Sequence, residues 1–128
     1  MTIQKIMMVD DEPHIRRIGE LSLRGVGRWQ VVLAGSGREA VEMARREQPD
    51  VILLDVMMPG MDGPATLAEL REVRETAAIP VIFLTAKAQR HEVERYRMLG
   101  AAGVLTKPFD PMTLPDEVRS IIEATPRH

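Results

Sequence analysis

The sequence of 128 residues contains no cysteine and no long uninterrupted apolar run. Without cysteine, the chain can form neither a disulfide nor a thiolate metal site. Asp10 and Asp55 interrupt its most apolar stretches, so none of them approaches the roughly 20 residues that a membrane helix needs. The N-terminal residues also lack the apolar segment of a signal peptide. We therefore expect a soluble, cytoplasmic protein.

The sequence also lacks an excess of basic residues. It has 17 lysines and arginines against 19 aspartates and glutamates, a formal net charge of −2. This balance disfavours binding to nucleic acid or to an anionic membrane, because both attract clustered positive charge. There is no GxGxxG segment and no P-loop lysine, which argues against a nucleotide site. The histidines lie among charged neighbours or at the end of the chain, and we assign no role to any of them: His14, His91 and His128.

Length and composition predict one domain over residues 1–128, because a 45% share of hydrophobic residues fills one core and leaves no room for a second. Within this domain, short apolar runs are bounded by polar or turn residues, as is typical of buried strands. The runs are residues 6–9, 31–34, 51–54, 81–84 and 103–106.

The segments between these runs have helical spacing. Ser36 and Glu39 form a capping-box pattern, Gly63-Pro64 suits the start of the next helix, and Thr113 is the expected cap of the last one. Residues 89–99 carry many charges and few apolar side chains, which indicates either a solvated face or a surface that shifts easily. In the first helix we expect Ile15, Ile18, Leu21 and Leu23 to be buried, and Arg16, Arg17 and Glu20 to face water.

Strands that alternate with short helices predict an α/β fold, a doubly wound parallel sheet with helices on both faces. Such sheets bind ligands at the carboxyl ends of their strands. Polar residues stand at four of these ends, so the fold is expected to gather them at one edge. They are Asp10, Asp11, Asp55, Thr85 and Lys107.

Carboxylates that converge on one site repel one another unless a cation or a proton intervenes. Oxygen ligands without nearby histidine or cysteine suit Mg²⁺, which often bridges carboxylates to a phosphoryl group. Thr85 supplies a hydroxyl donor and Lys107 a positive charge, both able to hold phosphoryl oxygens. A carboxylate can itself be the nucleophile, and Asp55, at the end of the central run, is the best placed.

Four segments, in order and at strand ends, resemble the receiver domain of two-component response regulators. They are MMVDDEP, VILLDVMMPGMDG, VIFLTAKA and GAAGVLTKPFDP. The resemblance covers nearly the whole chain and implies a flavodoxin-like (βα)5 fold with strand order 2-1-3-4-5. Because the chain ends soon after the expected fifth helix, we also expect a single receiver domain without an output domain, which passes its message by protein contact.

The resemblance implies a role for each matching residue. Asp55 would accept a phosphoryl group from the phosphohistidine of a histidine kinase or a histidine phosphotransfer protein. Lys107 would contact the phosphoryl oxygens, and Thr85 would turn inward to bond one of them. The peptide bond between Lys107 and Pro108 is typically cis in such domains, which would position Lys107. The Mg²⁺ ligands would be Asp10, Asp11, Asp55 and the backbone carbonyl of Met57.

The sequence departs from the family at Val104, where receivers commonly carry an aromatic residue that reports phosphorylation. The signal would then travel through the loop after Thr85 and the fourth helix, which holds Tyr96. Two other functions stay open. One is a Mg²⁺-dependent phosphohydrolase acting on a small molecule, although such enzymes place a second acid where this chain has Met57. The other is a phosphate-independent interaction module on the same fold.

Overall fold

The computed structural model describes residues 2–125 and forms one parallel sheet in the order β2-β1-β3-β4-β5. The expected strand order and the alternation of strands with helices are confirmed. The strands are β1 (Lys5–Val9), β2 (Gln30–Ala34), β3 (Val51–Asp55), β4 (Val81–Thr85) and β5 (Gly103–Thr106). The helices are α1 (Pro13–Leu21), a π-helical turn η1 (Ser22–Val26), α2 (Gly37–Glu47), α3 (Gly63–Glu72), α4 (Arg90–Met98) and α5 (Leu114–Ala124).

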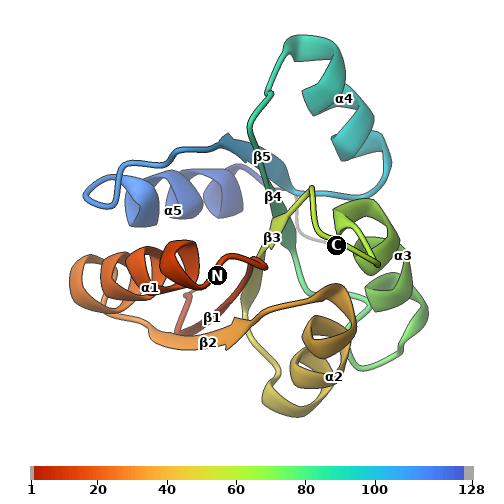
Figure 1. Cartoon of the computed structure of the whole chain (residues 1–128), viewed down its shortest axis with the longest axis horizontal. Coiled ribbons are helices and arrows are strands. Elements are labelled where there is room, and N and C mark those ends of the chain that lie inside the picture. The colour runs from red at the N-terminus through yellow and green to blue at the C-terminus, as the bar shows by residue number, and fades with distance from the viewer. Residues whose placement is uncertain (1, 126–128) are drawn as a thin grey trace.

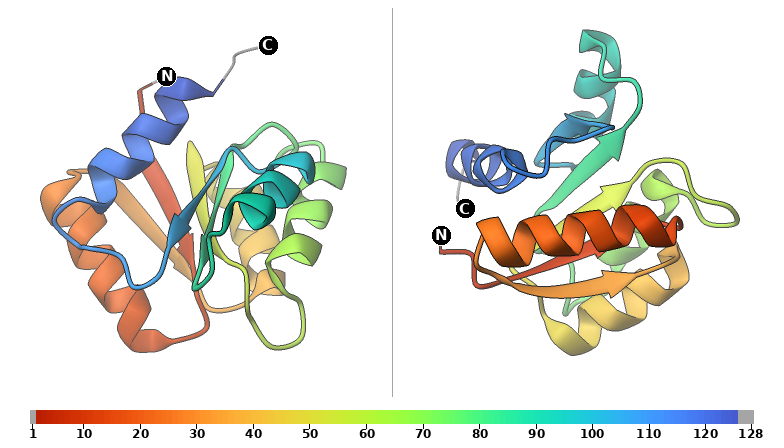
Figure 2. Two further views of the ribbon diagram at one scale, coloured as in Figure 1. Left: turned by 90° about the horizontal axis from the view of Figure 1, so that it is seen from above. Right: turned by 60° about the vertical axis from the view of Figure 1, so that its left-hand side comes forward.

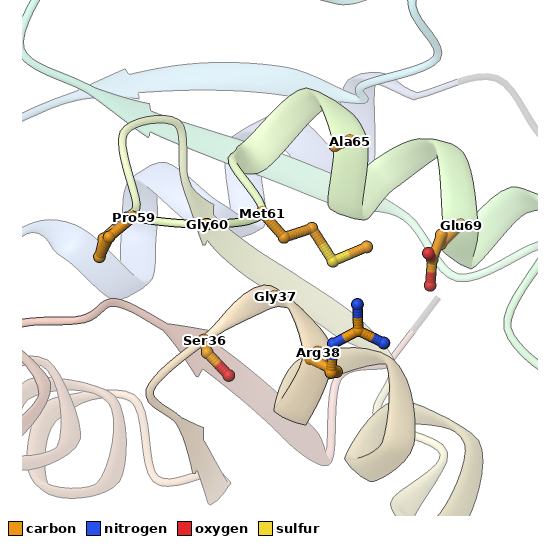
Figure 3. Close-up of a pocket in the computed structure, with 8 residues that line it drawn as sticks. All are labelled: Ser36, Gly37, Arg38, Pro59, Gly60, Met61, Ala65 and Glu69. Carbon is orange, nitrogen blue, oxygen red and sulfur yellow. The ribbon is translucent and has the colours of Figure 1, made fainter.

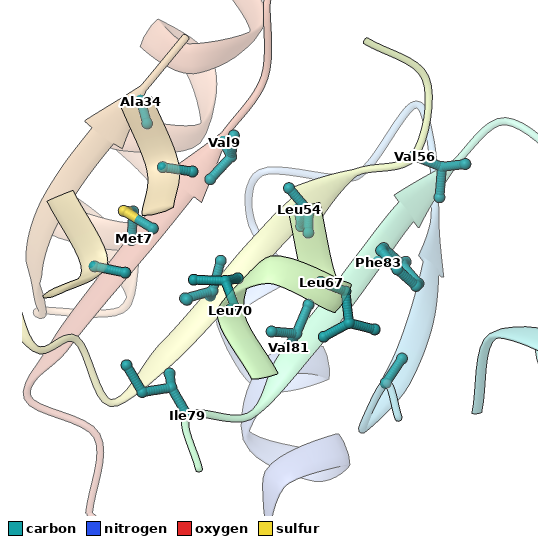
Figure 4. Close-up of a cluster of buried hydrophobic side chains, with 14 of the residues drawn as sticks. Met7, Val9, Ala34, Leu54, Val56, Leu67, Leu70, Ile79, Val81 and Phe83 are labelled. Carbon is teal, nitrogen blue, oxygen red and sulfur yellow. The ribbon is translucent and has the colours of Figure 1, made fainter. Parts of the chain in front are cut away.

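Helices cover both faces of the sheet, with α1 and α5 on one side and α2, α3 and α4 on the other (Figure 1). Side chains along each strand alternate between the two cores, as the pleat requires. Met7 and Val9 of β1 point towards α2 and α3, in the core that Figure 4 shows, whereas Ile6 and Met8 pack with α1 and α5. Both cores are apolar, which explains why the central strands read as continuous apolar runs.

The helix starts follow the local sequence. At α2, the Ser36 hydroxyl accepts the backbone N–H of Glu39 (3.1 Å), and the Glu39 carboxylate accepts the N–H of Gly35 (2.7 Å). This is a capping box whose return bond reaches one residue further back than the usual pattern. Thr113 is the cap residue of α5, as expected, but its hydroxyl donates to the Glu117 carboxylate (2.9 Å) and caps no backbone N–H.

The first helix differs from the prediction at its buried face. Leu21 is 66% exposed and Ile18 is 40% exposed, so the expectation that both are buried is wrong. The backbone of α1 lies directly on β1 at Gly19, where a Cβ atom would stand 2.0 Å from the Met8 sulfur. After Leu21 the helix widens into η1, and this change of pitch turns Leu23 into the core.

The single tryptophan lies at the edge of the sheet where the strands begin. Trp29 is buried just before β2, and the Arg119 guanidinium of α5 lies 4.7 Å above its ring. Arg119 also donates to the Gly27 carbonyl (3.0 Å), which fastens α5 to the end of η1. Between residues 2 and 125, no helix is both long and apolar enough to cross a membrane.

Candidate functional site

Three carboxylates meet at the edge where the strands end. Asp10 follows β1 and Asp55 ends β3, and these two strands are neighbours in the sheet. Asp11 follows Asp10, and one oxygen from each of the three lies within 4.8 Å of the others. Asp10 and Asp55 are buried, whereas Asp11 is half-buried. The structure thus brings together the acids that the sequence placed at one edge.

Lys107 reaches this cluster from the end of β5, which lies two strands away from β3 in the sheet. Its ammonium Nζ lies 3.0 Å from Oδ2 of Asp10 and 3.4 Å from Oδ2 of Asp55. The Lys107 backbone N–H donates to the Thr85 carbonyl (2.8 Å), which ties the lysine to the end of β4. The peptide bond between Lys107 and Pro108 is cis, in agreement with the expectation from the resemblance. One cation therefore bridges two buried carboxylates.

Burial sets the electrostatics of the site. It raises the pKa of Asp55, and the charge of Asp10 raises it further, while Lys107 and the N–H of Met57 (3.3 Å from Oδ1) oppose the shift. Burial alone would lower the pKa of Lys107, but its hydrogen bond to Asp10 and the charges of Asp10 and Asp55 outweigh that effect and raise it. The ammonium stays charged and only partly neutralises the carboxylates, so the cluster still favours a further cation.

Two other predicted residues lie beside the cluster. Thr85 is buried at the end of β4, where its hydroxyl accepts the N–H of Lys87 (3.2 Å). In residues 2–125, no hydrogen bond joins that hydroxyl to the side chain of Asp55 or Lys107. Met57 directs its side chain outwards and is 77% exposed, so only its backbone faces the acidic edge. The side chains of Thr85 and Met57 thus border the site, and only the Met57 backbone N–H contacts one of its charged side chains, that of Asp55.

Sequence reasoning missed one residue at this edge. Arg16 was expected to face water, but it is half-buried and its guanidinium donates to the Asp10 carbonyl (2.6 Å). The neighbouring Arg17 is exposed, as expected. Both occupy the first helix after the acidic pair, and the helical pattern alone does not tell them apart. Arg16 lies against the Asp10 carbonyl because of the way in which the chain turns from β1 into α1.

A groove of about 500 Å³ opens on the other side of the loop that follows β3. Figure 3 shows the side chain of Met61 lying in this groove between α2 and α3, with Arg38 and Glu69 nearby. Ser36 and Gly37 line the end nearest the sheet. None of the predicted site residues contributes to this groove, and the charged cluster described above is the better candidate for chemistry.

A five-stranded parallel sheet in this order, with three carboxylates and a lysine at its carboxyl edge, defines a flavodoxin-like domain with a charged cluster where such folds bind ligands. The sequence assigns the domain more narrowly. Residues 6–119 match the response regulator receiver domain family, and the chain belongs to that family.

Known proteins of this family match over most of the chain. The chemotaxis protein CheY4 of Vibrio cholerae is 32% identical, with a TM-score of 0.85 over 94% of this chain and 99% of that one. The receiver domain of a histidine kinase from Syntrophus aciditrophicus is also 32% identical, with a TM-score of 0.79 over 98% of this chain and 94% of that one.

Curated relatives are longer. The probable transcriptional regulatory protein TcrX of Mycobacterium tuberculosis is 36% identical over 94% of this chain and 50% of its own length. The regulatory protein PhoP of Bacillus subtilis, named for alkaline phosphatase synthesis, is 36% identical over 93% of this chain and 48% of its own. The chain thus spans about half the length of these relatives.

The chain is therefore a receiver domain of two-component response regulators. Receiver domains are generally signalling modules, not enzymes that turn over free substrates. They interact with histidine kinases and bind Mg²⁺ at an acidic pocket, and the cluster of aspartates here has the composition of such a pocket.

Proposed function

We propose that Asp55 accepts a phosphoryl group from the phosphohistidine of a histidine kinase or a histidine phosphotransfer protein. The observation that carries this proposal is the position of Asp55 at the end of β3, with Oδ2 3.4 Å from the Lys107 ammonium and the Asp10 carboxylate beside it. A carboxylate oxygen of Asp55 attacks phosphorus, the bond from phosphorus to the imidazole nitrogen breaks, and its electron pair stays on the imidazole.

We infer that Mg²⁺ is the cation of this site. Asp10, Asp11 and Asp55 offer oxygen atoms close together, and the Met57 carbonyl would complete the protein ligands. The fit is supported by an all-oxygen donor set and by the raised pKa of Asp55, to which burial contributes most and the charge of Asp10 second. When bound, the ion supplies positive charge against the carboxylates and the phosphoryl oxygens.

Two protein groups would hold the transferred phosphoryl group. Lys107 already lies between Asp10 and Asp55, and it would exchange its bond to Asp55 for one to a phosphoryl oxygen. The Thr85 hydroxyl accepts the Lys87 N–H, and its own proton is available to donate to a second oxygen. The chain would catalyse only this transfer to Asp55 and the later hydrolysis.

We further propose that the phosphorylated domain signals by protein contact through α4, β5 and α5. The phosphohydrolase alternative is disfavoured because Met57 stands where a second acid would protonate the leaving group. The formal net charge of −2 over the 128 residues supports protein partners in preference to nucleic acid.

The first test is intact mass after incubation with Mg²⁺ and acetyl phosphate. We expect wild type to gain the mass of one phosphoryl group and Asp55→Asn to gain none. Asp116→Asn, at an exposed acid of α5, is the matched control and should gain as much as wild type. Equal gain in Asp55→Asn would contradict the assignment of the acceptor.

If wild type gains no mass, beryllofluoride separates two causes. Its binding to wild type, with none to Asp55→Asn, would indicate an acyl phosphate that hydrolyses too fast to trap. No binding to either folded protein would favour the phosphate-independent interaction module.

A further inference from the structure

We propose that Arg16 is a positioning residue for cation binding, which orients Asp11 through the peptide unit that joins it to Asp10. The inference rests on the function proposed above, because it concerns the same acidic edge. Its starting observation is the hydrogen bond from the Arg16 guanidinium to the Asp10 carbonyl (2.6 Å). Arg16 touches a predicted ligand only through the backbone, so its effect on a cation would be indirect.

The position of the guanidinium is fixed from two directions. A Cβ atom on Gly35 would lie 3.1 Å from Nη1 of Arg16, so the arginine occupies space that glycine leaves at the end of β2. The Asp10 N–H donates to the Ala34 carbonyl (3.1 Å), which holds the loop after β1 beside the same point. Arg16 therefore lies where the neighbouring strands β1 and β2 end, bonded to Asp10 after β1 and packed against Gly35 after β2.

The Asp10 side chain is held by two bonds that do not involve Arg16. One carboxylate oxygen of Asp10 accepts the Glu12 N–H (2.9 Å), and the other accepts the Lys107 ammonium (3.0 Å). Asp11 is held differently. In the described part of the chain, its carboxylate has no hydrogen-bond partner, and it is half-buried.

The Asp11 carboxylate is therefore aimed by its backbone. The Asp10 carbonyl and the Asp11 N–H belong to one planar peptide unit, so a bond to that carbonyl sets the plane from which Asp11 projects. Partners of this kind, which orient a ligand without touching the metal, control metal affinity in many sites. The permanent charge of Arg16 itself repels Mg²⁺, so a loss of affinity on its removal would report the bond to the Asp10 carbonyl and not the charge.

The experiment is a calorimetric Mg²⁺ titration of the phosphate-free protein. For Arg16→Met, which keeps most of the aliphatic stem, we expect Mg²⁺ affinity to fall roughly tenfold, the lower end of the effect of such partners. Arg17→Met is the matched control, because it removes the same charge from an exposed neighbour on the same helix, and its affinity should equal that of wild type. Arg16→Lys should recover part of the loss, since its ammonium can still donate to the Asp10 carbonyl but lacks the planar fork of the guanidinium.

Gly35→Ala is a second variant, in which residue 16 is still arginine. Its added methyl group would displace the guanidinium by a few tenths of an ångström, so Mg²⁺ affinity should fall by less than in Arg16→Met. This variant also keeps the test valid if Arg16→Met does not fold, which thermal melting in EDTA would reveal.

Each result decides between defined outcomes. Wild-type affinity in folded Arg16→Met, or in Gly35→Ala where Arg16→Met does not fold, overturns the proposal. Equal losses in Arg16→Met and Arg17→Met also overturn it, because they would show an effect that does not depend on the bond to Asp10. If wild type itself binds no Mg²⁺, or if Asp10→Asn binds it as tightly as wild type, the proposed cation site fails and not merely the role of Arg16.

Discussion

Helices α1 and α4 flank the same acidic edge but are attached to the sheet in very different ways. The backbone of α1 lies on Met8 at Gly19, and Arg16 ties the helix to the loop that bears the acids. Each helix buries one residue, Gly19 in α1 and Tyr96 in α4, but α4 is attached through a side chain, since the Tyr96 ring packs edge-on against Phe83 with centroids 5.0 Å apart. Figure 2 shows α4 at the β5 margin of the molecule.

The difference separates a fixed side of the site from a side that can move. An element with few buried contacts opens at a lower free energy than one tied at several points. Ser22, just after α1, also donates to the Pro111 carbonyl in the segment that follows Lys107. The acids are thus held on the α1 side, whereas the ring of Tyr96 holds α4 against β4.

Removal of Lys107 should have the largest effect, because it breaks the fixed side at its centre. We expect Lys107→Met to slow phosphoryl uptake from acetyl phosphate about a thousandfold, the upper range for loss of one electrostatic donor. Lys87→Met, at an exposed lysine beside Thr85, is the control and should have a small effect. Similar rates for the two variants would show that Lys107 acts through general charge.

Truncation of Tyr96 tests the single anchor of α4. Tyr96→Ala should lower the free energy of unfolding by about 3 kcal/mol, as other aromatic truncations in cores do. Met98→Ala changes a side chain that is 88% exposed and should stay within about 0.5 kcal/mol of wild type. Urea denaturation measures both, and a negligible loss in Tyr96→Ala would show that α4 is attached elsewhere.

The raised pKa of Asp55 makes a prediction about pH. The folded protein holds the Asp55 proton more tightly than the unfolded chain does, so this group stabilises the fold at low pH, and the stabilisation is lost as pH rises through the raised pKa. At pH 7 and without Mg²⁺, Asp55→Asn should therefore be more stable than wild type by about 1 kcal/mol. The gain should shrink as pH falls through the raised pKa and should vanish below the ordinary pKa of 3.8. Lower stability of Asp55→Asn at pH 7 would contradict the pKa shift.

The smallest effect concerns the base of α4. The Arg71 guanidinium donates to the carbonyls of Ile79 (2.9 Å) and Gly100 (3.2 Å), and so holds the turn after α4 against α3. Arg71→Met should cost about 1 kcal/mol or less, since these bonds are partly exposed. Hydrogen exchange should speed up at residues 99–101 and stay unchanged in α1. Faster exchange in α1 as well would break the contrast between the two helices.

The sequence predicted the parts of this site that depend on strand order. Asp10, Asp55 and Lys107 each follow an apolar run, and a parallel sheet necessarily brings those ends to one edge. Arg16 was missed because helical periodicity describes a helix on its own, whereas the bond to Asp10 depends on how the chain turns into that helix. Leu21 was misplaced because α1 meets the sheet at Gly19, and a glycine gives no apolar signal to mark that face of the helix.

The place of Trp29 has a practical consequence. It lies at the edge where the strands begin, and β2 spans five residues between it and the acidic edge, or roughly 15 Å at the rise of a strand. Because it is the only tryptophan, its emission reports the packing of α5 against η1 and not the occupancy of the carboxylates. Tryptophan fluorescence can therefore follow unfolding while the acidic edge is titrated, with little optical interference between the two.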